Sequence, residues 1–217
     1  MIVTIDGPAG TGKSTVARLL ASRLGYEFLN TGAMYRAVAY ACLRQGIDLG
    51  DLEAVGQVPA KLEIVFTNDR LLLNGRDVTD EIRDQAITQA ASLVAANELV
   101  RRRLVALQRS AARGVNLVTE GRDQGTVVFT EAECKFFLTA SPEERARRRQ
   151  RELLERGEAV DLEDLLIQQE VRDERDETRA CSPLKPADDA IIIDTTPMSL
   201  EEVAAHLEDM VRQRRGG

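Results

Sequence analysis

Short apolar runs alternate along the chain with longer segments in which apolar residues recur at helical spacing. The first run, Ile2 to Ile5, is rich in β-branched residues and predicts a buried strand that ends at Asp6. Residues 13–24 follow with apolar side chains every three or four positions, which predicts a helix that Gly25 ends. The same patterns predict further strands at 26–29, 115–119, 135–138 and 190–194. They predict further helices at 31–45 (capped by Thr31), 51–60, 81–95, 98–112, 141–156, 161–176 and 199–212.

One segment departs from this alternation. Residues 62–66, 71–73 and 76–79 are strand-like, and the first two of these are joined at Asn68-Asp69. Asn74-Gly75 is a strong signal for a two-residue hairpin. We therefore expect a small antiparallel β insertion in an α/β fold, whose main sheet is parallel and five-stranded with helices on both faces.

Polar residues stand where the predicted parallel strands end. In open α/β sheets, ligands bind beyond the carboxyl ends of the strands, so the functional site is expected at this edge. The residues at these ends are Asp6, Asn30, Glu120, Thr139 and Asp194.

Composition narrows the possible partners. The 217 residues carry a net charge of −7 and 43% of them are hydrophobic, which predicts a soluble globular protein and argues against a general nucleic-acid or membrane-surface binder. No apolar run reaches membrane-spanning length and no secretion signal is visible, so we expect a cytoplasmic protein. Three cysteines without CxxC spacing and a single histidine argue against a zinc site. Any anionic ligand must then be met by local basic clusters, chiefly of arginine.

The segment GPAGTGKS, Gly7 to Ser14, matches the P-loop pattern at every fixed position and lies between a predicted strand and a predicted helix. Its glycines let backbone N–H groups point at phosphate oxygens, Lys13 reaches the terminal phosphates, and Ser14 offers its hydroxyl to magnesium. The DxxG and NKxD motifs of switch GTPases are absent, and a motor domain would be larger. A small P-loop kinase remains.

Three further motifs contain arginine beside predicted strand ends or in loops at the same edge: NTGAMYR (30–36), TEGRDQGT (119–126) and RDERDETR (172–179). With the P-loop, the insertion containing NGRDVTDEIR and the closing PLKPADDAIIIDTT, they resemble the bacterial cytidylate kinases, which belong to the nucleoside monophosphate (NMP) kinases. The resemblance covers essentially the whole chain. The motifs TGAxYR and GRDxGTVVF carry its specificity, because many families share the P-loop.

The resemblance implies a role for each matching residue. ATP would bind along Gly7, Pro8, Ala9, Gly10, Thr11, Gly12, Lys13, Ser14 and Thr15, with Ser14 as a magnesium ligand. Arg36, Arg122 and Arg179 would bind the CMP phosphate and, with Lys13, act in catalysis. Ser92, Arg101 and Asp123 would recognise the cytosine, Arg172 and Asp176 the ribose, and Thr31 and Tyr35 would also contact the substrate. Asn30 and Glu120 stand where aspartate is common in the family.

The resemblance also implies a division of the chain and an activity. The core would comprise residues 1–31, 94–148 and 177–217, the NMP-binding insertion residues 32–93, and a helical lid residues 149–176. The implied activity is phosphoryl transfer from MgATP to CMP or dCMP in pyrimidine nucleotide metabolism, by a monomer. Two alternatives remain open: a small P-loop kinase for another monophosphate such as UMP, and a nucleotide-binding module without transfer activity.

Overall fold

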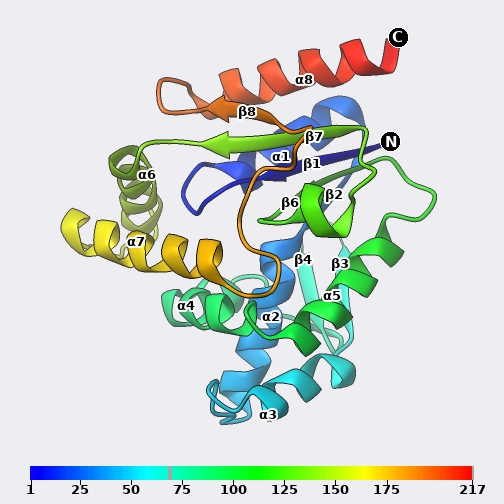
Figure 1. Cartoon of the computed structure of the whole chain (residues 1–217). Helices are drawn as coiled ribbons and strands as arrows, with labels where there is room; N and C mark the ends of the chain where they lie inside the picture. Colours follow the sequence, from blue (N-terminus) through cyan, green and yellow to red (C-terminus); the bar gives the residue numbers. More distant parts are fainter. Residues whose placement is uncertain (68–69, 217) are drawn as a thin grey trace. The chain divides into compact units, whose positions relative to one another are not determined.

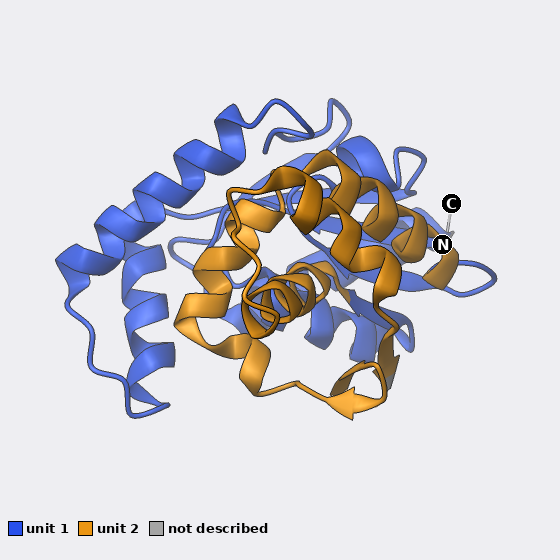
Figure 2. Ribbon diagram, turned by 90° about the horizontal axis from the view of Figure 1, so that it is seen from below, with its two compact units in different colours: residues 1–29, 112–217 blue, residues 30–111 orange. Residues whose placement is uncertain are grey.

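The computed structural model describes residues 1–67 and 70–216. Their contacts divide the chain into two units, Met1–Leu29 with Ala112–Gly217, and Asn30–Ala111, coloured separately in Figure 2. The predicted division into core, insertion and lid uses different boundaries and stays a prediction. Among the described residues, no helix is both long enough and apolar enough to cross a membrane.

The first unit is built on a five-stranded sheet of order β2-β6-β1-β7-β8 (Figure 1). Its strands are β1 (Ile2–Asp6), β2 (Glu27–Asn30), β6 (Leu117–Glu120), β7 (Cys134–Thr139) and β8 (Ile191–Asp194). The central strand β1 runs parallel to both β6 and β7, and β7 runs parallel to β8. This confirms the predicted parallel sheet, and each of the five polar residues named above is the last residue of its strand.

The helices of this unit are α1 (Lys13–Leu24), α6 (Pro142–Leu154), α7 (Leu162–Thr178) and α8 (Leu200–Gly216), with one π-helix, η3 (Gln124–Val128). Side chains alternate between the two faces of a strand. Val3 and Ile5 of β1 join the core that α1 and α8 cover, whereas Asp6 points to the opposite face, where η3 lies. Helices α1 and α8 therefore cover one face of the sheet, and η3 lies against the other at β1.

Helices α6 and α7 pack side by side and have a separate small core (Figure 1). It consists of Ala146, Leu153 and Leu165, and none of these belongs to the core of the sheet. Ser141 caps α6 by accepting a hydrogen bond from the N–H of Glu144 at 3.2 Å, and Pro142 occupies the first turn, as predicted.

The second unit contains helices and a three-stranded antiparallel sheet of order β3-β4-β5. Asn74 (φ +50°) and Gly75 (φ +78°) both adopt left-handed conformations, which confirms the predicted hairpin turn. The predicted turn at Asn68-Asp69 lies outside the described residues. The elements are α2 (Thr31–Arg44), α3 (Leu52–Gln57), η1 (Val58–Lys61), β3 (Ile64–Thr67), β4 (Arg70–Leu73), β5 (Arg76–Asp77), η2 (Glu81–Arg83), α4 (Gln85–Val94) and α5 (Glu98–Ala111).

Three helix predictions were wrong in detail. Residues 81–95 form η2 and α4 instead of one helix, because Asp84 has an extended ψ of 144° and its side chain caps α4. Asn30, and not Thr31, caps α2: its Oδ1 accepts a hydrogen bond from the N–H of Ala33 at 2.8 Å. Residues 51–60 divide into α3 and the 3₁₀-helix η1, which contains Pro59.

Candidate active site

The loop between β1 and α1 has the backbone that a phosphate-binding loop needs. Gly7, Gly10 and Gly12 have φ values of +141°, +80° and +87°. A Cβ atom at Gly7 would lie 2.1 Å from the carbonyl oxygen of Leu138, so this close approach to β7 requires glycine. Gly12 is the N-cap of α1, and the first N–H groups of a helix, which lack partners within it, favour anions.

Lys13 lies in the first turn of α1 and is 5% exposed. Its Nζ donates to the carbonyl oxygen of Pro8 at 2.5 Å and to Oγ1 of Thr11 at 3.3 Å. Burial, followed by the nearby Arg122 charge, lowers the pKa of Lys13 well below its ordinary value. An anionic ligand at this loop would counter both effects, which fits a site for phosphate.

Ser14 and Glu120 bring a hydroxyl and a carboxylate together at the start of α1. The Ser14 hydroxyl donates to Oε1 of Glu120 at 3.0 Å. Among the described residues no cluster of three or more Asp, Glu, His or Cys side chains could bind a metal ion by itself. One hydroxyl and one carboxylate nevertheless fit magnesium, which is commonly bound by few protein oxygens together with substrate phosphates and water. Thr15, the last residue predicted at the ATP site, is exposed on α1.

Asp6, the last residue of β1, is a buried carboxylate that sequence analysis placed at the ligand edge without giving it a role. Its Oδ1 accepts from the N–H of Gln124 at 2.9 Å, and its Oδ2 accepts from the N–H of Gly125 at 2.8 Å. Burial raises the pKa of Asp6 to about 7, although the two backbone hydrogen bonds oppose this shift. The segment that Asp6 holds includes the predicted cytosine-binding residue Asp123, which is 3% exposed and is the N-cap of η3.

Three arginines with predicted substrate roles surround Asp176, a carboxylate of α7. Nε of Arg122 donates to Oδ2 of Asp176 at 2.9 Å, and Nη1 of Arg179 lies 3.9 Å from Oδ1 of the same residue. Burial alone would raise the pKa of Asp176, but the charges of Arg122, Arg172 and Arg179 hold it below its ordinary value. Arg179 also donates to the carbonyl oxygen of Ser182 at 2.6 Å. The proposed phosphate and ribose residues of this unit therefore form one network.

The remaining predicted substrate residues lie in the second unit. Arg36 and Tyr35 are neighbours on α2, where Thr31 is the buried first residue. The guanidinium carbon of Arg101, on α5, lies 5.7 Å from the centre of the Tyr35 ring, within the range of a cation–π contact. Ser92 on α4 is also buried. This unit thus brings Tyr35 and Arg101 together.

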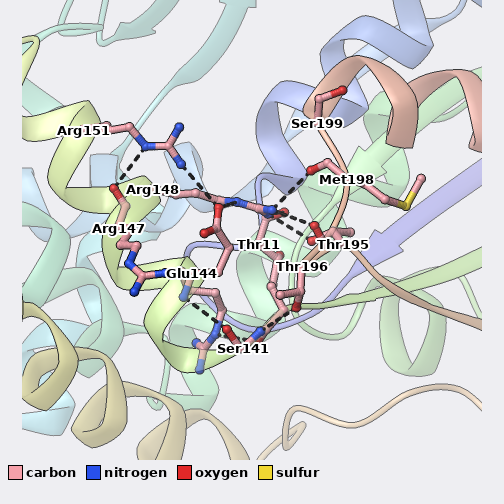
Figure 3. Close-up of polar contacts among 12 residues, drawn as sticks. Thr11, Ser141, Glu144, Arg147, Arg148, Arg151, Thr195, Thr196, Met198 and Ser199 are labelled. Atoms are coloured by element: carbon pink, nitrogen blue, oxygen red, sulfur yellow. Dashed lines mark hydrogen bonds and ion pairs between the residues drawn. The ribbon is translucent and has the colours of Figure 1, made fainter.

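Two arginines of α6 bind the phosphate-binding loop, and sequence analysis missed both. Nη1 of Arg145 donates to the carbonyl oxygen of Ala9 at 3.1 Å and to Oδ2 of Asp173 at 2.5 Å. Arg148 donates to the carbonyl oxygen of Thr11 at 3.3 Å and to the carbonyl and hydroxyl oxygens of Thr195 at 2.6 and 3.0 Å (Figure 3). Their spacing of three residues places both on one face of α6, but Arg148 and Arg151 have the same spacing, so the sequence pattern does not single these two out.

Comparison with known proteins identifies the family to which the chain belongs. The family model for cytidylate kinase matches residues 3–213. The chain belongs to the cytidylate kinase family. A cytidylate kinase from Mycobacterium leprae is 52% identical over 217 residues, which cover 100% of this chain and 97% of the relative. One from Rhodopirellula baltica is 47% identical over 213 residues, covering 98% of this chain and 93% of the relative.

A solved structure supports the same fold. The crystal structure of an uncharacterized protein from Eubacterium ventriosum matches with a TM-score of 0.54 at 13% identity and covers 98% of both chains. At this identity the likeness concerns the fold alone. The family match confirms the resemblance that the sequence motifs predicted, and it makes the chain a member of a family of phosphotransferases.

Proposed function

We propose that this protein transfers the γ-phosphoryl group of ATP to CMP or dCMP, giving ADP and CDP or dCDP. The observation that carries this proposal is the family match over residues 3–213, to which the geometry of the phosphate-binding loop adds a buried Lys13 and the Ser14–Glu120 pair. The donor phosphates would lie along Gly7–Ser14, at the N-terminus of α1.

The acceptor residues in this proposal are those that match the family motifs. Arg36, Arg122 and Arg179 would bind the CMP phosphate, and Arg172 and Asp176 would bind the ribose. Tyr35 and Thr31 would also contact the acceptor. The cytosine would meet Ser92, Arg101 and Asp123. The amino group of cytosine can donate to the Asp123 carboxylate, whereas uracil presents a carbonyl oxygen there, so the site would favour CMP over UMP.

The reaction would need positioning and charge stabilisation more than a strong base. An oxygen of the CMP phosphate is already ionised at neutral pH and would attack the γ-phosphorus in line with the leaving oxygen of ADP. Lys13 and the arginines would stabilise the charge on the transferred group. Magnesium, held through Ser14 with Glu120 beside it, would neutralise charge on the donor phosphates when bound. Closure of the helical lid over both substrates would exclude water and prevent hydrolysis of ATP.

CDP formation from a panel of monophosphates tests the proposal. CMP or dCMP should be the best acceptor, and faster turnover of UMP or AMP would contradict the cytosine assignment. ATP binding without transfer to any acceptor would favour a binding module. Lys13→Ala should remove most turnover while the fold is retained, and Lys185→Ala, which changes an exposed lysine of the same unit, should not. Near-normal rates for Lys13→Ala would refute the role of the loop.

A further inference from the structure

The last two residues of β1 hold the segment that contains Arg122 and Asp123 at both of its ends. The carbonyl oxygen of Ile5 accepts from the N–H of Gly121 at 3.0 Å. The carboxylate of Asp6 accepts from the next two N–H groups beyond Asp123, those of Gln124 and Gly125, at 2.9 and 2.8 Å. Arg122 and Asp123 therefore lie between two attachments to the same strand.

Asp6 takes the place of an N-terminal capping side chain for η3. Asp123 is the N-cap of η3 and makes no side-chain capping bond to that helix. Asp6 supplies the acceptor for the first N–H groups of η3 from another strand. The segment approaches the sheet closely at Gly125, where a Cβ atom would lie 3.1 Å from Oγ1 of Thr4 and 3.2 Å from Cδ of Lys135.

Asp6 is also joined directly to Gly7, the first residue of the phosphate-binding loop. One residue thus connects the proposed donor loop, through the chain, and the proposed acceptor segment, through two hydrogen bonds. We infer that Asp6 is a positioning residue that fixes Arg122 and Asp123 for binding of the acceptor nucleotide. This inference rests on the proposed function, and Asp6 acts in it through the backbone of residues 124 and 125 without touching substrate.

If Asp6 positions the segment through its two hydrogen bonds, the KM for CMP should depend on the protonation state of Asp6. An ionised carboxylate offers an acceptor oxygen to each of the two N–H groups, whereas a protonated one, like asparagine, offers one acceptor and one donor. Burial places the pKa of Asp6 at about 7, within the range of an enzyme assay. The charges that act on Asp6 are those of Asp123, before η3, which raises its pKa, and of Lys13, on α1, which lowers it, and Lys135 of β7 also lies beside Gly125.

The test compares the Asp6→Asn protein with the wild type at about pH 8.5 and about pH 6. At the higher pH the KM for CMP should be on the order of 10- to 100-fold higher in the variant, because one charge-assisted hydrogen bond is lost. The KM for ATP should stay within about twofold of the wild-type value. At the lower pH the ratio of variant to wild-type KM for CMP should approach one. Titration of the CMP phosphate cancels in that ratio. Glu208→Gln removes a carboxylate charge from the surface of α8 and should change neither KM at either pH.

A second variant covers the case in which Asp6→Asn does not fold. Gly125→Ala places a Cβ atom 3.1 Å from Oγ1 of Thr4 without changing a charge, and a shift of the segment by a few tenths of an ångström should raise the KM for CMP, but not that for ATP, at both pH values. Equal effects on CMP and ATP, or a CMP ratio for Asp6→Asn that does not change with pH, would overturn the positioning role. If the wild-type protein forms no CDP, the proposed function itself fails. CDP formation by the wild type with an unselective variant overturns the role of Asp6 alone.

Discussion

Replacing Arg148 by methionine removes a guanidinium that joins three segments while it keeps most of the aliphatic side chain. Arg148 binds Glu144 on its own helix at 2.9 Å, the carbonyl oxygen of Thr11 at 3.3 Å, and both the carbonyl and hydroxyl oxygens of Thr195. It also donates to the carbonyl oxygen of Met198 at 3.4 Å (Figure 3). The side chain is 15% exposed, so water replaces few of these bonds when the guanidinium is removed.

The expected loss in free energy of unfolding follows from the shortest hydrogen bonds that Arg148 makes to other segments. The two bonds to Thr195, at 2.6 and 3.0 Å, are charge-assisted, and each such bond stabilises a protein by about 1.5–3 kcal/mol. The longer bonds to Thr11 and Met198 add little, and Glu144 keeps a second arginine partner, Arg151, at 3.3 Å when Arg148 is replaced. Because contributions at one site are not additive, we expect Arg148→Met to lower the free energy of unfolding by about 3 kcal/mol.

The assay is equilibrium unfolding in urea with a matched variant of the same helix. In a protein of this size, a loss of about 3 kcal/mol corresponds to a Tm lower by about 6–12 °C. Arg151 is 66% exposed and makes longer contacts, so Arg151→Met should cost less than about 0.5 kcal/mol. If Arg148→Met and Arg151→Met lowered the free energy of unfolding by the same small amount, the bonds of Arg148 would not stabilise the fold and this reasoning would be refuted.

Three further outcomes are expected. Gly7→Ala should destabilise the protein by on the order of 4 kcal/mol in urea unfolding, because the new Cβ would lie 2.1 Å from the carbonyl oxygen of Leu138; a loss below about 1 kcal/mol would contradict the close approach. Asp176→Asn should raise the KM for both CMP and dCMP on the order of tenfold, because Asp176 also holds Arg122 at 2.9 Å; an effect on CMP alone would separate the ribose from the phosphate site. Asp6 has a folded-state pKa of about 7, above its ordinary 3.8, so its stabilising contribution is complete below that ordinary value and is lost as the pH rises through 7. From about pH 5 to pH 7 the wild type should therefore lose on the order of 2–3 kcal/mol of unfolding free energy relative to Asp6→Asn, and parallel pH curves would contradict the raised pKa.

The parallel sheet and its ligand edge were predictable because both follow from local patterns. Apolar runs marked the strands, and the residue that ends each strand, such as Asp6 or Glu120, stood next to a polar or glycine-rich segment. Asn74-Gly75 specified its hairpin through left-handed backbone conformations that few other residues adopt easily. The family motifs supplied the candidate residues, but not their partners.

Features that depend on distant partners were not predictable from local pattern. The π-helix η3 begins where Asp6, 118 residues earlier in the chain, accepts the N–H of Gln124. Arg145 and Arg148 lie in a run of arginines in which nothing local distinguishes the two that reach the phosphate-binding loop. The break at Asp84 shows the opposite case, because an aspartate N-cap is a local signal that a continuous apolar pattern concealed.

The small core between α6 and α7 has a consequence for hydrogen exchange. Ala146, Leu153 and Leu165 share no residue with the core of the sheet, so these two helices can separate without opening that core. Such an opening exposes two buried leucines, at about 1.5–3 kcal/mol each, and breaks the ion pair between Arg145 and Asp173, which together cost less than unfolding of the whole unit. Backbone amides of α7 should therefore exchange with deuterium through a local opening, before those of β1 do. The lid proposed at residues 149–176, which contains most of α7, would then include a segment that opens locally.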